Sequence, residues 1–483
     1  MENWLIKQSE LVPYRTALVY EGKTWNFKQL KVVVHKTAGK LAKFAGRLGK
    51  RVAVIAGNTP ASYFMVLALQ QLGVQPVLLN CRLAFSEVER QREDADVSVV
   101  FVDDVLKKSF GGYVKKNAHY YLISELDAIL PKEPSIIQSF KDEEVASVMY
   151  TSGTTGQPHG VLQTFRNHFF SAVGSAFNLG LNPNDQWLCA VPIFHISGLS
   201  IMMRSLIYGT SVVLVPHFDP VKITQILVSS PVSLMSVVPV MLKQLLNLYP
   251  SEGYNSFFRA FLLGGAPIDA VTLDRCKERG INVIQSYGLT ETCSQIVALN
   301  FADAPSKIGS VGKPLFPVQV RIASKTGEIE VKAPNVVQGY LNDQVSFDDK
   351  LTQDGWFRTG DLGQFDDEGF LFIKGRKDEM FISGGENVFP NEIEAVYVKA
   401  AGIKGIAVIG IPDKVWGQVP YAFVEPETDF ELDDAMLKLY GKKHLAHYKV
   451  PQKFIRVDQL PRTANGKLKH AEIRKNFLKN NNW

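Results

Sequence analysis

Hydrophobic residues along the chain form short runs rich in β-branched and aromatic side chains, which alternate with longer stretches of helical spacing. Strands are predicted at 16–20, 23–26, 51–56 and 75–79, and helices at 27–45 and 60–72. This alternation of strands and helices predicts a mainly parallel sheet covered by helices on both faces. The same rhythm continues through strands predicted at 186–191, 211–215 and 234–238.

From about Gly309 the pattern changes to shorter strands punctuated by glycine and proline, at 318–322 and 327–331. This change predicts a small β subdomain. The charged segment 374–378 then precedes a last stretch with its own α+β pattern, which is long enough for an independent core. We therefore predict an α/β protein with a large N-terminal domain over 1–375, including the β subdomain, and a small C-terminal domain over 376–483.

One glycine-rich loop is a candidate for binding phosphate. Tyr150 to Val161 reads YTSGTTGQPHGV and follows an apolar, strand-like segment at 144–150. Its glycines allow successive backbone N–H groups to turn toward an anion, and its hydroxyl groups add neutral donors. A helix predicted from about Asn167 would add a positive dipole end. The segment predicts a polyphosphate site, and a mobile surface linker is the alternative for such a composition by itself.

Three further predicted strands end in polar or glycine-rich sequence. The segments are PIFHISG after Val191, GGAP after Leu263 and QSYGLTE from Gln285. Ligands of open α/β sheets lie outside the carboxyl ends of the strands, so these segments are candidates for ligand contact.

Composition narrows the class of partner. The chain has 483 residues, of which 46% are hydrophobic and 21% charged, and its net charge is +5. This charge is too small to predict a nucleic-acid or membrane partner and supports only a mild preference for anionic substrates. The start of the sequence lacks the apolar core of a secretory signal, so a cytoplasmic location is expected. The four scattered cysteines predict reduced thiols rather than a zinc site.

Five motifs occur in order along nearly the whole chain: YTSGTTG at 150–156, QSYGLTET at 285–292, TGD at 359–361, GRKD at 375–378 and PRTANGK at 461–467. Together they resemble the adenylate-forming superfamily of acyl-CoA synthetases, peptide-synthetase adenylation domains and luciferases. The resemblance implies that a carboxylate attacks the α-phosphate of ATP, with Mg²⁺ as cofactor, and that the thiol of coenzyme A then displaces AMP. It also implies a mobile C-terminal domain that rotates between the two steps. Within the superfamily, the stretches from Gln163, Phe194, Tyr287 and Ser383 are most similar to ligases that join o-succinylbenzoate, an aryl dicarboxylate of menaquinone biosynthesis, to coenzyme A.

The same resemblance implies roles for single residues. Lys467 is expected to bridge the carboxylate and the α-phosphate, His195 to place the reacting carboxylate, and Thr290 to hydrogen-bond to the α-phosphate. Glu291 is the implied magnesium ligand. The expected ATP and AMP contacts are Thr151, Ser152, Gly153, Thr154, Thr155, Gly156, Gly264, Gly265, Ala266, Ser286, Tyr287, Gly288, Thr290, Asp361, Arg376 and Lys467.

The acyl substrate is expected to meet His195, Ser197, Arg204 and Gly265, with Arg204 suited to the second carboxylate by two parallel hydrogen bonds. Asp378 occupies the hinge position, and Gly384 and Gly385 are expected to line the coenzyme A channel. Each of these residues has an ordinary alternative. Lys467 would be a turn lysine, His195 a structural histidine, and Arg204 an outward-facing helix residue.

One position departs from the family pattern. His159 stands where the family loop usually has lysine. A free histidine side chain, with an ordinary pKa of ~6.5, carries only part of a positive charge at neutral pH. We therefore expect weaker contact with the β- and γ-phosphates, and ATP binding that weakens as pH rises through neutrality.

Other functions remain open on the sequence alone. Another aryl- or acyl-CoA synthetase would differ only in its substrate, and an adenylation enzyme that loads a carrier protein would need a docking surface. A non-catalytic binding protein is disfavoured by the presence of Glu291, Asp361, Arg376 and Lys467. Luciferase-like oxygenation and a homodimeric state are also left open.

Overall fold

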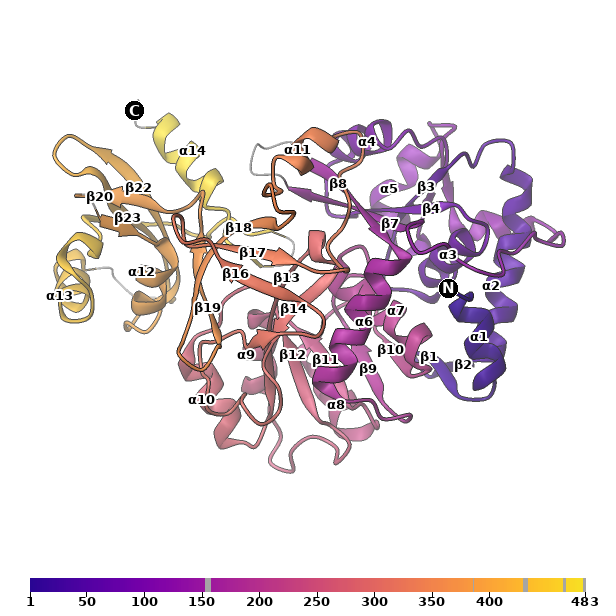
Figure 1. Ribbon diagram of the computed structural model, residues 1–483, viewed down its shortest axis with the longest axis horizontal. Helices are drawn as coiled ribbons and strands as arrows, with labels where there is room; N and C mark the ends of the chain where they lie inside the picture. The colour runs from indigo at the N-terminus through magenta and orange to yellow at the C-terminus, as the bar shows by residue number, and fades with distance from the viewer. Residues whose placement is uncertain (153–157, 385, 429–432, 464–465, 481–483) are drawn as a thin grey trace. The chain divides into compact units, whose positions relative to one another are not determined.

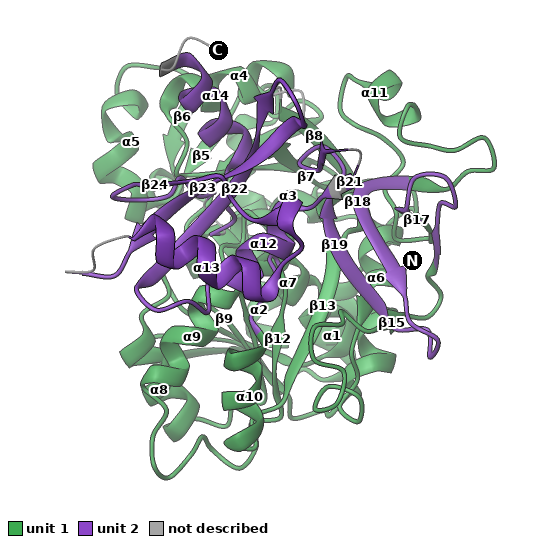
Figure 2. Ribbon diagram, turned by 90° about the vertical axis from the view of Figure 1, so that its left-hand side faces the viewer, with its two compact units in different colours: residues 1–264, 270–319, 331–357 green, residues 265–269, 320–330, 358–483 purple. Residues whose placement is uncertain are grey.

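The computed structural model describes residues 1–152, 158–384, 386–428, 433–463 and 466–480 (Figure 1). These residues form two compact units, which Figure 2 colours separately. Unit 1 contains residues 1–264, 270–319 and 331–357, and unit 2 contains residues 265–269, 320–330 and 358–483. No helix of the described residues is long and apolar enough to cross a membrane.

A six-stranded sheet forms the first layer of unit 1. Its order is β6 (Tyr120–Leu122), β5 (Val100–Val102), β3 (Arg51–Ile55), β4 (Gln75–Leu79), β7 (Val145–Ser152) and β8 (Pro158–Thr164). All neighbours are parallel except β7 and β8. Helices α2 (Phe27–Leu41), α3 (Pro60–Gln71), α4 (Phe85–Asp94) and α5 (Lys107–Val114) belong to the same part of the chain. The strands β3, β4 and β5 are mostly buried and nearly continuously apolar, as expected for a sheet covered on both faces.

The strand β8 corrects the expectation for the phosphate loop. Residues 158–164 pair antiparallel with β7, in a register that runs from Ser152 opposite Pro158 to Val145 opposite Thr164. The helix α6 (Phe165–Leu179) therefore begins at the far end of β8. At about 3.3 Å per strand residue, its N-terminus lies roughly 20 Å along the hairpin from the loop. The expected dipole contribution at the loop was wrong, because a strand separates loop and helix.

A nine-stranded sheet forms the second layer of unit 1. Its order is β15 (Lys313–Pro314), β14 (Ser294–Ala298), β13 (Val283–Leu289), β12 (Ala260–Leu263), β11 (Leu234–Val237), β9 (Gln186–Cys189), β10 (Ser211–Leu214), β1 (Thr16–Tyr20) and β2 (Lys23–Asn26). The strands from β13 to β1 are parallel, and antiparallel pairs close both edges. The other helices of unit 1 are α1 (Trp4–Leu11), α6, α7 (Ile196–Tyr208), α8 (Pro220–Ser229), α9 (Pro239–Asn247), α10 (Ala270–Glu278) and α11 (Gln344–Asp348). The prediction of parallel α/β layers is confirmed, but the strands divide between two sheets.

The predicted β subdomain divides between the two units, and its longer strands lie mainly in unit 2. Its four-stranded sheet has the order β16 (Gln319–Ile322), β17 (Glu328–Lys332), β18 (Phe357–Phe365) and β19 (Leu371–Arg376). A second sheet has the order β21 (Glu386–Val388), β20 (Phe381–Ser383), β23 (Gly417–Pro426) and β22 (Ile403–Asp413), and β24 (Lys453–Arg456) pairs with β23. The α-helices among the described residues of this unit are α12 (Pro390–Tyr397), α13 (Asp434–His444) and α14 (His470–Asn480).

The strand β22 is buried on both faces. Ile406 and Val408 pack in one apolar cluster with residues of α12 and α13, whereas Ala407 and Ile409 pack in another with Ile473 of α14. The alternation follows from the two-residue period of a strand. Helices therefore cover both faces of this sheet. The predicted boundary after residue 375 separates a fixed domain from one that is expected to rotate. The compact units divide the chain by packing and at other positions, so this boundary stays a prediction.

Candidate active site

The carboxyl ends of β11, β12 and β13 lie next to one another in the nine-stranded sheet. Leu263 is paired with Gln285, and the amide of Gly264 donates to the carbonyl of Val237 at 3.2 Å. The hydroxyl of Ser286 donates to the carbonyl of Leu263 at 3.0 Å. The structure therefore brings Gly264 and Ser286 together, and half-buried Tyr287 follows Ser286 on β13.

The turn that carries His195 is fixed by two other residues. A Cβ at Gly198 would lie 2.4 Å from the carbonyl oxygen of Pro192, so the turn requires glycine there. Buried Asn58 donates to the carbonyl of Val191 at 3.0 Å and accepts from the amide of Ile193 at 3.0 Å. Asn58 follows β3 of the other sheet, so its amide group joins the two sheets beside His195. The sequence analysis missed Asn58, whose only local signal is the helix start at Thr59-Pro60.

The imidazole of His195 is available to a ligand. His195 precedes α7 and its side chain makes no capping hydrogen bond there. Its Nε2 atom is buried and has no hydrogen-bond partner among the described residues. Burial, reinforced by the positive charge of Arg82, lowers the pKa of His195 to about 4. The ring is therefore neutral near pH 7 and suited to orienting an anion by one hydrogen bond.

Arg204 lies inside unit 1 and not on its surface. It is 2% exposed, and its Nη2 donates to Ser294 Oγ at 3.2 Å and to Gln295 Oε1 at 3.4 Å. Its guanidinium carbon lies 5.3 Å from the ring centre of Trp187, and Nε has no partner among the described residues. Among the described residues, no carboxylate lies within ion-pair distance of Arg204. Burial lowers the pKa of Arg204. The outward-facing alternative is excluded, and the cation lacks a compensating charge.

The structure does not join Ser197 to Arg204. They are seven residues apart on α7, about 10 Å along the helix axis. Ser197 is half-buried, and its carbonyl accepts from the Ser200 hydroxyl at 3.3 Å. The expected pair could therefore only contact different parts of a ligand.

The turn that contains Thr290 and Glu291 is held by three donors from two other segments. The carbonyl of Thr290 accepts from Gln163 Nε2 at 3.1 Å, that of Glu291 from the amide of Val337 at 2.9 Å, and that of Thr292 from Asn335 Nδ2 at 2.8 Å. Before this turn a Cβ at Gly288 would lie 2.1 Å from the carbonyl oxygen of Ser294, which explains the glycine. Each carbonyl of the turn thus has a donor from outside it.

Gln163 also belongs to a buried polar chain. Its Oε1 accepts from Ser147 Oγ at 2.8 Å, and Ser147 Oγ lies 3.0 Å from Nε2 of His168. His168 Nδ1 lies 3.3 Å from Sγ of Cys293. Burial, together with the charge of Arg204, lowers the pKa of His168 to about 3, so the chain is neutral. It connects β7 and β8 to the Glu291 turn.

The Glu291 carboxylate is oriented by a tyrosine that the sequence analysis missed. Tyr340 donates to Glu291 Oε1 at 2.9 Å, and His159 stacks on the Tyr340 ring with centroids 4.7 Å apart. His159 Nδ1 lies 3.1 Å from Asp343 Oδ2. Of the described residues, none is hydrogen-bonded to Glu291 Oε2. A half-buried carboxylate with one open oxygen fits Mg²⁺, which binds proteins through one or two carboxylates and completes its shell with water and phosphate.

In unit 2, two of the expected AMP contacts, Asp361 and Arg376, are paired with each other. Asp361 on β18 lies opposite Arg376 on β19, and Arg376 Nη1 lies 3.2 Å from Asp361 Oδ1. Arg376 Nε lies 3.2 Å from Asp378 Oδ1, so the hinge candidate joins the same cluster. Burial disfavours the guanidinium charge, but the two carboxylates outweigh it and raise the pKa of Arg376.

Lys467 and Gly384 belong to separate turns of unit 2. Lys467 is exposed, and its amide and carbonyl bond to Thr463 Oγ1 at 3.2 Å and to the Thr463 amide at 2.7 Å. Gly384 has φ 60, and its amide donates to the carbonyl of Trp416 at 2.9 Å. Gly265 and Ala266 belong to the short segment 265–269 of the same unit. Gly153, Thr154, Thr155, Gly156 and Gly385 lie outside the described residues, and so does the side chain of Ser152; Thr151 is half-buried at the end of β7.

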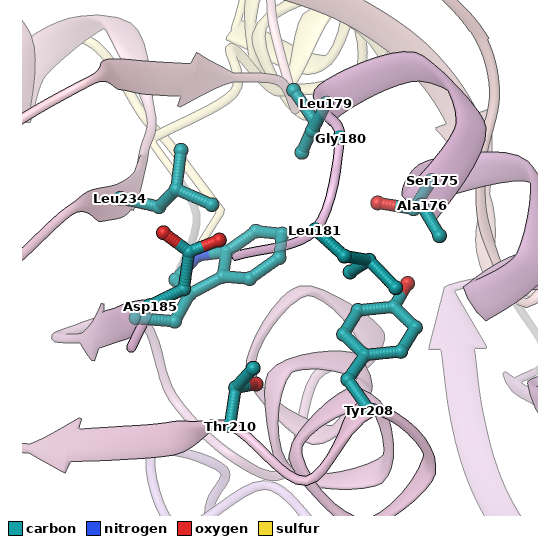
Figure 3. Close-up of a pocket in the computed structure, with 10 residues that line it drawn as sticks. Ser175, Ala176, Leu179, Gly180, Leu181, Asp185, Tyr208, Thr210 and Leu234 are labelled. Carbon is teal, nitrogen blue, oxygen red and sulfur yellow. The ribbon is translucent and has the colours of Figure 1, made fainter. Parts of the chain in front are cut away.

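A small cavity in unit 1 does not serve as the acyl site. Its lining includes Ser175, Asp185, Trp187 and Tyr208. Figure 3 shows Ser175, Asp185 and Tyr208 around the cavity. The cavity volume is about 10 Å³, which is roughly the room for one water molecule. Asp185 is already paired with Arg259 at 2.7 Å.

Known proteins match this chain along its length. Residues 5–341 match the family model of AMP-binding enzymes, and residues 392–467 match that of the AMP-binding enzyme C-terminal domain. The 2-succinylbenzoate–CoA ligase of Listeria monocytogenes is 46% identical, with 99% of this chain and 100% of the relative aligned. A relative of the same name from Geobacillus is 42% identical over 99% of this chain and 98% of the relative.

Two solved structures of one bacterial protein are also similar. The o-succinylbenzoate CoA synthetase of Bacillus subtilis in complex with the acyl-adenylate OSB-AMP is 39% identical, with a TM-score of 0.92 and 98% of each chain covered. The same protein in complex with ATP and magnesium ion is 38% identical, with a TM-score of 0.91 and coverage of 98% of this chain and 99% of that one.

Proposed function

This chain belongs to the AMP-binding enzymes and, within them, to the family of the 2-succinylbenzoate–CoA ligases, and we propose from its site that it joins 2-succinylbenzoate to coenzyme A through an acyl-adenylate. The observation that carries the choice of substrate is Arg204. A fully buried guanidinium without a carboxylate partner in the described chain is costly unless a ligand supplies the opposite charge. A substrate with a second carboxylate supplies it.

In the first half-reaction an oxygen of the succinyl carboxylate attacks the α-phosphorus of ATP. The bond from the α-phosphorus to the bridging oxygen breaks, and pyrophosphate leaves with the electron pair. Lys467 would neutralise the charge that develops on the carboxylate and α-phosphate, and Thr290 would donate a hydrogen bond to the latter. Glu291 would hold Mg²⁺, which when bound neutralises phosphate charge. Neutral His195 would orient the attacking carboxylate.

In the second half-reaction the thiolate sulfur of coenzyme A attacks the acyl carbon. A thioester forms as the bond from the acyl carbon to the phosphate oxygen breaks, and AMP leaves. Asp361 and Arg376 would retain the ribose during this exchange, since a carboxylate accepts from both sugar hydroxyls. We assign the hinge to Asp378 and the coenzyme A channel to Gly384, with residues 376–483 rotating between the steps.

The direct test is pyrophosphate release by the purified full chain with ATP and Mg²⁺. Acids to compare are 2-succinylbenzoate, benzoate, a fatty acid and an amino-acid panel, each with and without coenzyme A. We expect release that depends on 2-succinylbenzoate, and a thioester only when coenzyme A is present. Turnover with another acid alone would overturn the substrate, and no release with any acid would overturn the reaction.

The surroundings of the enzyme are part of the proposal. We place it in the cytoplasm, where ATP and coenzyme A are available, with small molecules as its substrates and no nucleic-acid or membrane partner. A net charge of +5 over 483 residues supports this choice. A homodimer stays a prediction, and light scattering of the purified protein measures it.

A further inference from the structure

A buried histidine in unit 2 lies between two carboxylates. His470 begins α14, and its Nε2 lies 2.6 Å from Glu394 Oε1 while its Nδ1 lies 3.2 Å from Glu379 Oε1. The side chains of His470 and Glu394 are 12% and 14% exposed. Neither the motifs nor the proposed chemistry uses this cluster.

The cluster joins three segments that are distant in sequence. Glu379 directly follows the hinge candidate Asp378, and Glu394 lies on α12. His470 is three residues beyond Lys467. Glu394 is itself fixed to the central sheet of the unit, because its Oε1 accepts from the amide of Val408 on β22 at 2.7 Å.

Electrostatics favour a charged imidazole in this place. Burial opposes the charge, but the carboxylate charges of Glu379 and Glu394, together with the hydrogen bond between Nε2 and Glu394, raise the pKa of His470 to about 10. For Glu379, burial alone would raise the pKa, and the nearby charges of His470, Arg376 and Lys467 reverse this and lower it. Glu379 thus links the segment after the hinge candidate to His470.

The turn that carries Lys467 is closed on itself. Arg462 pairs with Leu468 across its base, and the amide of Lys469 donates to the carbonyl of Pro461 at 3.0 Å. Leu468 packs in the apolar cluster that contains Ile473. The described part of the turn is held by its own hydrogen bonds. Fixing the end of the turn at His470 therefore also restricts the position of Lys467.

We propose that the imidazolium of His470, held between Glu379 and Glu394, fastens the Lys467 turn to the segment after the hinge, so that rotation at Asp378 carries Lys467 as part of one rigid body. His470 is then a positioning residue for adenylation. This inference rests on the proposed roles of Lys467 and Asp378.

The test separates the two half-reactions in the full chain. Adenylation is measured as 2-succinylbenzoate-dependent pyrophosphate release. The second step is measured as thioester formation from synthetic acyl-adenylate and coenzyme A, which does not need Lys467. The variants are His470→Gln and Glu379→Gln, and the matched control is Lys469→Gln, which removes a neighbouring charge in an exposed pair with Glu472 at 3.1 Å.

We expect both variants to lower the adenylation rate by roughly 10- to 100-fold, the effect of misplacing a reacting group by about 1 Å. Thioester formation should stay within about threefold of wild type, Lys469→Gln should change neither step, and His470→Arg should recover adenylation by pairing with both carboxylates.

Equal losses in both steps, or no loss in either, would overturn the proposal. If His470→Gln does not fold, as judged by its thermal transition, Glu379→Gln decides alone, since it keeps the pair of His470 with Glu394. Lys467→Ala serves as the reference. If Lys467→Ala keeps its adenylation rate, the role proposed for Lys467 is wrong. An equal effect of His470→Gln on both steps would instead overturn only the role proposed for His470.

Discussion

Replacing Arg204 with methionine should separate substrate recognition from stability. Methionine has a comparable length and no charge, so the variant removes the buried cation and keeps most of the side-chain volume. If Arg204 holds the aromatic carboxylate of the substrate, the variant should lose its preference for acids that carry this carboxylate and stay folded. If Arg204 is structural, the protein should lose stability first.

The expected change in stability is small because two large terms oppose each other. The two hydrogen bonds of Nη2 to neutral oxygens are worth roughly 1.5–3 kcal/mol each, and the contact with Trp187 about 2 kcal/mol. Leaving the cation buried costs several kcal/mol. The difference is within about 2 kcal/mol, which corresponds to a shift in Tm of less than ~8 °C.

The expected change in recognition is larger. Removing one partner of a buried, hydrogen-bonded charge pair costs about 2–5 kcal/mol, or roughly 30-fold to several thousand-fold in kcat/KM. The assay is pyrophosphate release with 2-succinylbenzoate and with 4-oxo-4-phenylbutanoate, which lacks the aromatic carboxylate. Arg204→Met should lower kcat/KM for the first substrate and leave the second nearly unchanged.

Arg259→Met is the matched control for this experiment. Arg259 pairs with Asp185 at 2.7 Å, so its removal leaves a carboxylate that is 8% exposed without its partner. That variant should lose about 3–5 kcal/mol of stability and keep the preference for 2-succinylbenzoate. An equal fall in kcat/KM for both acids with Arg204→Met, or no fall for 2-succinylbenzoate, would refute our reasoning.

Three further predictions concern single contacts. Tyr340→Phe removes the hydrogen-bond donor to Glu291, so half-maximal activity should need roughly 10-fold more Mg²⁺. The ATP-dependent binding of Mn²⁺, measured by electron paramagnetic resonance, should weaken by the same factor. Unchanged metal binding would contradict this prediction. The pKa of His470 is raised to about 10, so its ion pairs contribute stability that is fully present below pH ~6.5 and is lost as pH rises through about 10. The Tm should therefore fall between pH 7 and 10 more steeply in wild type than in His470→Gln. Parallel curves of Tm against pH would exclude the effect. His159→Lys should flatten the dependence of the ATP KM on pH between 6 and 8.5, because lysine stays charged over that range, and a wild-type KM that is already flat would disprove the expectation.

The sequence by itself determined much of the local structure and the chemical class. The bounds of β1, β2 and β4 agree with the predicted ranges, because hydrophobic period and turn residues act over a few positions. The five motifs likewise pointed to the family, since each needs only short-range sequence. Gly264 and Ser286 were expected to contact a ligand because ligands of open α/β sheets lie outside the carboxyl ends of the strands.

Only the tertiary structure decided which distant segments meet. The strand β8 lies where the sequence predicted a loop that leads into a helix. Its pairing with β7 could not be predicted, because no short-range hydrophobic pattern indicates it. Whether Arg204 faces inward depends on what packs around α7, in which nine of thirteen residues are buried. Tyr340 lies 49 residues from Glu291, and His470 lies 76 residues from Glu394. Such contacts depend on how separate elements pack, so a pattern of short-range spacing carries no sign of them.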